Sequence, residues 1–215
     1  MTAIPVAGTA PVFISFGGGS SISQSVTVPA GCTGLTVFFG LDPAGTIASR
    51  TVSACTFNAA TLTQVSGSRV TSTDGTFTSA EWWRKVTPST GAHTFAATLS
   101  SASRGGVWIC FDVGDTGVGQ VNAAQDSVVA LNGTSTPLDS SMIRFGCVFQ
   151  PTGVPSLVQT QAGPFQIGFN AGAGGANNAV VTSYQRGYPA GNHPSVSNDG
   201  TAGRGVACSA IEILS

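Results

Sequence analysis

The sequence predicts an all-β protein, more specifically an antiparallel, jelly-roll-like β-sandwich. Only 17 of the 215 residues are Asp, Glu, Lys or Arg, too few to solvate the outer faces of helices. Short runs rich in β-branched and aromatic residues alternate with Gly, Pro, Asn and Asp at intervals of roughly 8–15 residues, a spacing typical of all-β proteins. Within 22–28, Ile22, Val26 and Val28 fall on one face of a strand and hydroxyl side chains fall on the other.

The individual strands follow from these runs and from the turn residues between them. The expected strands are 11–16, 22–28, 34–41, 52–57, 61–65, 76–86, 92–99, 106–113, 127–131, 141–149, 165–169, 179–185 and 205–214. Asn58 and the two alanines after it predict a tight turn between two of these strands. The Pro-Ser-Thr-Gly sequence at 88–91 predicts that the strands on either side of it are antiparallel neighbours.

The predicted organisation is a single domain with an extended N-terminal arm. We expect the arm at 1–21, where it is able to lie on a neighbouring subunit, and the β-sandwich domain at 22–215. A loop-rich insertion is expected at about 165–205. Its Gly- and Asn-rich stretch, 168–179, is interpreted as a surface loop, because the Lys-Ser or Lys-Thr of a phosphate-binding loop does not follow it.

The charge pattern argues against two classes of partner. The net charge is −1 and the cations stand singly along the chain, so we expect no nucleic acid and no anionic membrane as partner. The first ten residues lack the basic and apolar regions of a secretory signal, and no apolar run approaches the roughly 20 residues that span a bilayer. A soluble protein made in the cytoplasm is therefore expected.

The cysteines are predicted to be structural. Cys32, Cys55, Cys110, Cys147 and Cys208 are widely spaced and form no CxxC pair. Three of the five lie in apolar runs, where a reduced cysteine behaves as a small hydrophobic residue. Buried thiols and a reducing compartment are favoured over a disulfide framework or a metal site.

Catalytic groups are scarce, so we expect a protein that is not an enzyme and has no cofactor. His93 and His193 are the only imidazoles, and no G-x-S-x-G motif accompanies them. Asp112 and Asp115 form a weak candidate pair for calcium, although aspartates that cap a turn are the favoured interpretation.

Trp82 and Trp83 are the most informative aromatic pair. Adjacent residues of a strand point to opposite faces, so at most one of the two rings enters a one-sided core. The other ring is either exposed or covered by loops or by the arm. An exposed ring suits stacking on a sugar or burial in a subunit contact, and Arg84 would stack on the ring that shares its face. These three residues are the candidate interface or glycan-binding residues.

Four short segments carry a family likeness. They are Val28-Pro29-Ala30-Gly31 before a long apolar strand, Thr56-Phe57-Asn58 with Leu62-Thr63, Glu81-Trp82-Trp83, and Gly91-Ala92-His93-Thr94. In this order they resemble the β-sandwich domain of bacteriophage virion proteins and of some bacterial surface proteins. The likeness is good over 25–113 and loose over 125–214, and it includes no catalytic motif.

The resemblance implies a structural protein of a virion, made in the host cytoplasm. A capsid decoration (cement) protein or a head or tail appendage is expected, with the major capsid protein or other virion proteins as partners and a homotrimer as the assembly. The Ser-, Thr- and Gly-rich surface agrees with this, because short side chains lose little entropy when a contact orders them. The alternative is a carbohydrate-binding module of a phage fibre or bacterial surface that binds cell-surface glycans.

Overall fold

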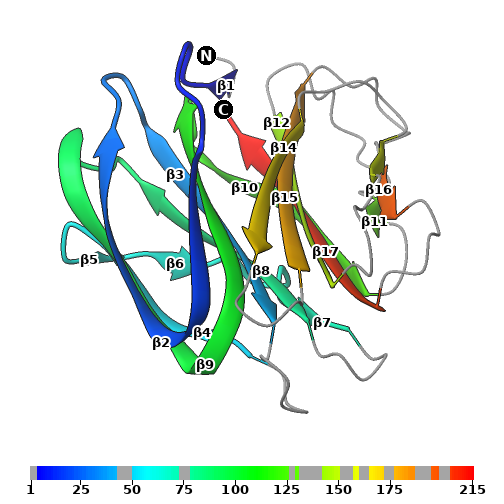
Figure 1. Ribbon diagram of the computed structural model, residues 1–215. Coiled ribbons are helices and arrows are strands. Elements are labelled where there is room, and N and C mark those ends of the chain that lie inside the picture. Colours follow the sequence, from blue (N-terminus) through cyan, green and yellow to red (C-terminus); the bar gives the residue numbers. More distant parts are fainter. Residues whose placement is uncertain are drawn as a thin grey trace.

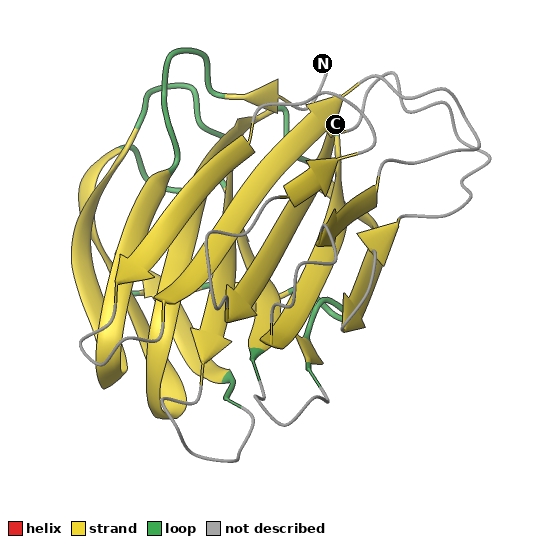
Figure 2. Ribbon diagram, turned by 45° about the vertical axis from the view of Figure 1, so that its right-hand side comes forward, coloured by secondary structure: helices red, strands yellow, loops and turns green. Residues whose placement is uncertain are grey.

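Two antiparallel sheets lie face to face in the computed structural model (Figure 1). The structure describes residues 4–42, 50–72, 78–125, 129–130, 142–150, 157–159, 165–171, 177–186, 195–198 and 204–215. Every regular element among them is a strand, and no helix occurs in these ranges (Figure 2). The predicted all-β, antiparallel sandwich is therefore confirmed.

The first sheet has nine strands and curls into a nearly closed barrel. Its strands are β1 (Ile4–Pro5), β2 (Val12–Val28), β3 (Gly34–Asp42), β4 (Val52–Phe57), β5 (Ala60–Thr61), β6 (Thr63–Gln64), β7 (Val70–Thr71), β8 (Ser79–Val86) and β9 (Gly91–Val113). The main order is β5-β4-β9-β3-β8-β6, with β1 and β2 paired to β9 and with β7 paired to β8. The sheet curls back on itself because β5 and β6, the two end strands of this order, are almost continuous in sequence.

The second sheet has five strands and covers one face of the first. Its order is β10-β17-β12-β15-β14, and a separate sheet of three strands has the order β11-β16-β13. These strands are β10 (Gly117–Gln125), β11 (Val129–Ala130), β12 (Met142–Gln150), β13 (Leu157–Gln159), β14 (Phe165–Ala171), β15 (Asn177–Arg186), β16 (Ser195–Asn198) and β17 (Arg204–Leu214).

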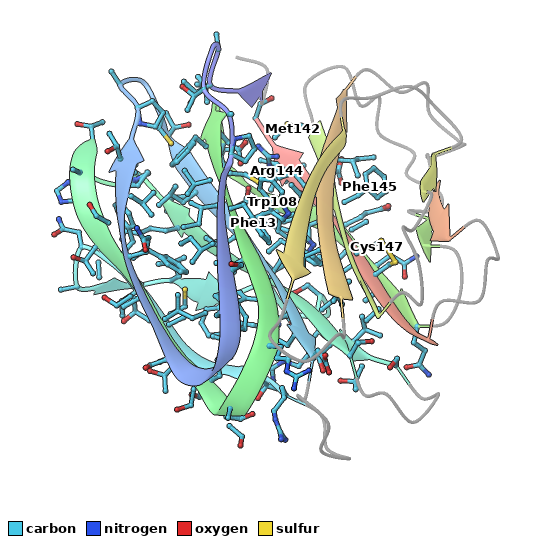
Figure 3. The ribbon with its side chains drawn as sticks, in the orientation of Figure 1. Phe13, Trp108, Met142, Arg144, Phe145 and Cys147 are labelled. Carbon is cyan, nitrogen blue, oxygen red and sulfur yellow. A yellow bond between two sulfur atoms is a disulfide. The ribbon has the colours of Figure 1, made fainter. Side chains whose placement is uncertain are left out.

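The curl of the first sheet and the cover of the second create two hydrophobic cores. One core lies inside the barrel and contains Phe39, Phe57 and Phe95. The other lies between the sheets, where Phe38 and Trp108 pack with residues of the second sheet. Figure 3 labels Trp108 in this space. Strand β3 separates the cores, and all nine of its residues are buried. A strand covered on both faces needs apolar residues on both, which explains the nearly continuous apolar run at 34–41.

Two pairs of predicted strands are single long strands. The expected strands 11–16 and 22–28 are parts of β2, which pairs with β9 along its length from Val12↔Ile109 to Val28↔Gly91. The expected N-terminal arm is therefore corrected, because β1 and the first part of β2 belong to the first sheet of the same chain and no boundary falls at residue 21. Likewise, 92–99 and 106–113 are both parts of β9.

Of the two turns predicted from the sequence, only the first joins antiparallel neighbouring strands as expected. Asn58 and Ala59 both have positive φ, 50° and 59°, as a tight hairpin turn requires, and they join the antiparallel pair β4 and β5. By contrast, the turn at 88–91 does not make β8 and β9 neighbours. Strand β3 lies between them and pairs with both, so that prediction is wrong.

The expected loop-rich insertion at 165–205 also needs correction. Strands β14 and β15 lie within it and pair from Phe165↔Ser183 to Ala171↔Asn177. Both belong to the second sheet. Part of the Gly- and Asn-rich stretch is therefore strand, whereas 172–176 lies outside the described residues.

Candidate functional site

Trp82 and Trp83 are both buried, with relative exposures of 0% and 7%. The Trp82 ring packs against Phe38 with centroids 4.8 Å apart, and its Nε1–H donates a hydrogen bond of 3.2 Å to the carbonyl oxygen of Ser209 in the second sheet. The Trp83 ring lies in the barrel core. Of the two alternatives, the covered ring is therefore the one found. The assumption of a one-sided core is wrong, because β8 is covered on both faces, and neither ring offers a face to a sugar or another subunit.

Glu81, the residue before Trp82, stabilises the barrel where the two ends of its sheet approach each other. Its buried carboxylate accepts hydrogen bonds from the backbone N–H of Val52 (2.6 Å) and from Nε1–H of Trp83 (3.2 Å). Arg69 adds two hydrogen bonds to Oε2, from Nε at 3.1 Å and from Nη2 at 2.8 Å. Because Val52 begins β4 and Glu81 lies in β8, one carboxylate connects the strands next to the two ends of the curled sheet.

Arg84 contacts an aspartate rather than an indole ring. Its guanidinium forms a bidentate ion pair with Asp115, with Nε 3.0 Å from Oδ2 and Nη2 close to Oδ1. Burial raises the pKa of Asp115 above its usual value, an effect that the hydrogen bonds from Arg84 oppose. The backbone N–H of Asp115 donates to Oγ1 of Thr33 at 3.1 Å, which fixes the turn after β9. The predicted stacking of Arg84 on a tryptophan is therefore wrong.

Asp112 forms the corresponding ion pair between the two sheets. It lies in β9 and binds Arg144 of β12, with Nε of Arg144 3.2 Å from Oδ2, and both side chains are buried. Thr36 donates a hydrogen bond of 2.8 Å to the same Oδ2. Figure 3 shows Arg144 pointing from the second sheet into the space between the sheets.

These ion pairs change the interpretation of the calcium candidates. Asp112 and Asp115 each bind an arginine, and the described residues contain no cluster of three or more His, Cys, Asp or Glu side chains that is able to hold a metal ion. Asp112 lies within a strand, so the favoured interpretation as a turn cap is also wrong for that residue.

The described carboxylates share one property, which is burial. They are Asp42, Glu81, Asp112, Asp115 and Glu212, with relative exposures between 0% and 6%. The exposed faces of the described strands are therefore free of negative side chains. In β2, for example, only Ile22 and Val26 are buried between Ser21 and Thr27, and serine and threonine fill four of the five exposed positions.

His93 stabilises a turn. Its Nε2 lies 2.9 Å from the carbonyl oxygen of Thr90, and its ring meets the edge of Phe57 at 5.6 Å between centroids. These contacts agree with the position at the start of β9 that the sequence indicated. His193 lies outside the described residues.

The cysteines divide into one disulfide and three buried thiols. Cys147 of β12 and Cys208 of β17 are directly opposite each other, with Cα atoms 4.1 Å apart, and they form a disulfide. The prediction of thiols alone is therefore wrong for this pair. Cys32, Cys55 and Cys110 are free and buried, and burial raises the pKa of each thiol.

A groove of about 540 Å³ lies at one edge of the sandwich, and of the three predicted interface residues only Arg84 lines it. Strands β6 and β8 form one side and β10 forms the other. The lining residues are Thr61, Thr63, Gln64, Val65, Ser66, Arg84, Lys85, Val86, Val118, Gly119 and Val121. The groove contains hydroxyl, amide and valine side chains and two cations, but no aromatic ring.

Comparisons with family models, with curated proteins and with solved structures gave no match to this chain. Among the described residues, no helix has the length and apolar character needed to cross a membrane.

Proposed function

We propose that this protein is a non-enzymatic structural component of a bacteriophage particle, and specifically a capsid decoration (cement) protein that stabilises the shell through repeated subunit contacts. The observation that carries the proposal is the distribution of charge. All five described carboxylates are buried, and three of them bind arginines that hold strands or sheets together. The phage context comes from the sequence resemblance over 25–113.

A surface of this kind suits permanent contacts. The exposed positions of β2 and of the first half of β9 are mostly serine, threonine and alanine. Such side chains have few rotamers to lose, and no carboxylate has to be desolvated when another subunit covers these strands. The proposed partners are the major capsid protein or other virion proteins, and the proposed assembly is a homotrimer.

The test is a count of copies in purified particles. Quantitative mass spectrometry of particles from an infected culture is expected to find the protein in many copies, in a fixed ratio to the major capsid protein. Particles assembled without it are expected to release their DNA at a lower temperature, and addition of the purified protein should restore the original temperature. Absence of the protein from washed particles would contradict the proposal.

The carbohydrate-binding alternative receives no specific support from the described residues. Sugar-binding surfaces typically present an aromatic ring on which the sugar stacks. All three tryptophans are buried, and the edge groove has no aromatic residue. We therefore propose no second function.

A further inference from the structure

Strand β2 is the outermost strand on its side of the first sheet. It pairs with β9, and Phe95 of β9 is opposite Gln24 of β2 on one side and opposite Phe57 of β4 on the other. Figure 1 shows β2 and β9 side by side, bending together. From Ser21 to Val28, no second strand of the described chain pairs with β2. Alternate backbone N–H and C=O groups here point away from β9 and are able to pair with a further strand.

The other outer strands of this sheet are short, whereas β2 is long. Strands β5, β6 and β7 have two residues each, and β2 has 17. Proteins protect free edges by short strands, charged side chains, prolines or bulges. From Ser21 to Val28, β2 has none of these, because its register shifts lie between Gly17 and Ser21 and no side chain before Asp42 is charged. A long, regular and uncharged edge is expected to be covered by a partner.

Gln24 occupies a special position on this edge. Ile22 and Val26 are buried in the barrel core, at 6% and 2% exposure. Alternation along the strand places Gln24 between them on the same face, yet its side chain is exposed, although Phe95 opposite it is completely buried. The amide of Gln24 therefore meets solvent at the margin of the core. An amide both donates and accepts hydrogen bonds, so it is able to pair with an identical amide.

We propose that β2 binds β2 of a second copy of this chain, antiparallel, with Gln24 of one copy opposite Gln24 of the other. This register places Ile22 of each copy opposite Val26 of the other and Ser23 opposite Ser25, so apolar residues meet apolar residues and hydroxyls meet hydroxyls. Such a twofold contact uses the same surface on both copies.

The lack of charge favours an identical partner. Two like edges with charged residues would repel each other where they meet, and a charged partner of another kind would find no opposite charge on β2 to select it. The contact is separate from the surface that a homotrimer needs, and the inference does not depend on the virion context.

The first experiment measures how many copies associate in solution. Sedimentation equilibrium of the full-length protein over a range of concentrations is expected to give an even number of copies. Two copies are expected from the β2 contact alone, and six are expected if the proposed homotrimer also forms through another surface. A single copy or three copies at every concentration would overturn the proposal.

Charge variants at Gln24 test the register. Gln24→Lys or Gln24→Glu places two like charges opposite each other, so each variant alone should associate about tenfold more weakly or less and show half the number of copies. A mixture of the two variants pairs Lys with Glu and should restore the original number. Thr94→Lys is the matched control, because it adds the same charge at an exposed position of β9, one strand away from the edge, and should change nothing.

Two outcomes would contradict this contact. One is a mixture of the two Gln24 variants that does not reassociate, and the other is an equal loss of association in Thr94→Lys. Because Gln24 and Thr94 are both exposed, far-UV circular dichroism should show that every variant is folded.

Hydrogen exchange at single residues tests strand pairing directly. In the associated protein, the amides of Ser21–Val28 that point away from β9 should be protected as well as those that point toward it. In Gln24→Lys, only the amides that point toward β9 should stay protected. Equal exchange in the two proteins, or a difference confined to another part of the molecule, would overturn strand pairing as the mode of contact.

Discussion

The indole rings of Trp82 and Trp83 lie in two different hydrophobic cores, although the residues are adjacent in β8. Trp82 packs between the sheets and donates a hydrogen bond to Ser209, whereas Trp83 packs inside the barrel and donates one to Glu81. Neighbouring side chains of a strand always point to opposite faces. Both are buried because β8 lies in a layer that is covered on each side.

The burial of these rings predicts the fluorescence of the protein. The chain has three tryptophans, and Trp82, Trp83 and Trp108 are all less than 10% exposed. We expect emission at shorter wavelength than that of the unfolded chain, with little quenching by iodide in the native state and strong quenching in denaturant. A native fraction accessible to iodide would contradict the burial of at least one ring, and single Trp→Phe variants would identify which.

The ion pair between Asp112 and Arg144 should be costly to break on one side only. Arg144→Met leaves the Asp112 carboxylate buried without its cation, and we expect a loss of about 3–5 kcal/mol in the free energy of unfolding. The double variant Asp112→Leu with Arg144→Met removes both charges and should recover at least half of this loss. Urea denaturation of both variants measures the difference. If the double variant is as unstable as Arg144→Met alone, an isolated charge is not the cause.

The cysteines should react in two stages. In the native, non-reduced protein we expect no rapid reaction with a thiol reagent at pH 8, because Cys32, Cys55 and Cys110 are buried and burial raises the pKa of their thiols. Unfolding without a reductant should expose three thiols, and unfolding with a reductant should expose all five. Mass spectrometry of the labelled chain counts them. Five labelled thiols without a reductant would contradict the Cys147–Cys208 disulfide.

Gly146 allows the two sheets to approach each other. A Cβ atom at this position would overlap the ring of Phe38 across the space between the sheets. Gly146→Ala is therefore expected to lower the free energy of unfolding by about 1–3 kcal/mol. Gly17→Ala is the matched control, because no atom lies within 4 Å of a Cβ placed there, and it should change stability by less than about 0.5 kcal/mol. Thermal unfolding of the two variants provides the comparison.

The strands that could be predicted are those whose signal is local. The runs at 34–41, 52–57 and 141–149 correspond closely to β3, β4 and β12, since apolar residues and flanking turns define such strands within a few positions. Strand β10 was missed because Gly117–Gln125 has few large apolar residues. From the sequence, β2 and β9 are each divided in two because glycines near 17–19 and 105–106 are typical of turns. In the structure the pairing of β2 with β9 continues past these glycines, with register shifts between Gly17 and Ser21.

The candidate site was less predictable, because its residues come together only in the folded chain. Arg84 binds Asp115, 31 positions away, through the turn that follows β9. Cys147 and Cys208 are 61 positions apart and meet because β12 and β17 pair in one register. No sequence motif marks the residues that line the edge groove. The groove exists because β6 and β10 end their sheets at the same side of the sandwich.

By itself, the sequence determined the all-β class, the antiparallel character and the scarcity of charge, because composition and alternation act within a few residues. Only the tertiary structure decided that both faces of β8 are buried and which arginine binds each aspartate. The reason is physical. A strand's pattern shows which side chains share a face, but burial of that face depends on a second sheet, as with Trp82 and the Ser209 carbonyl 127 residues away.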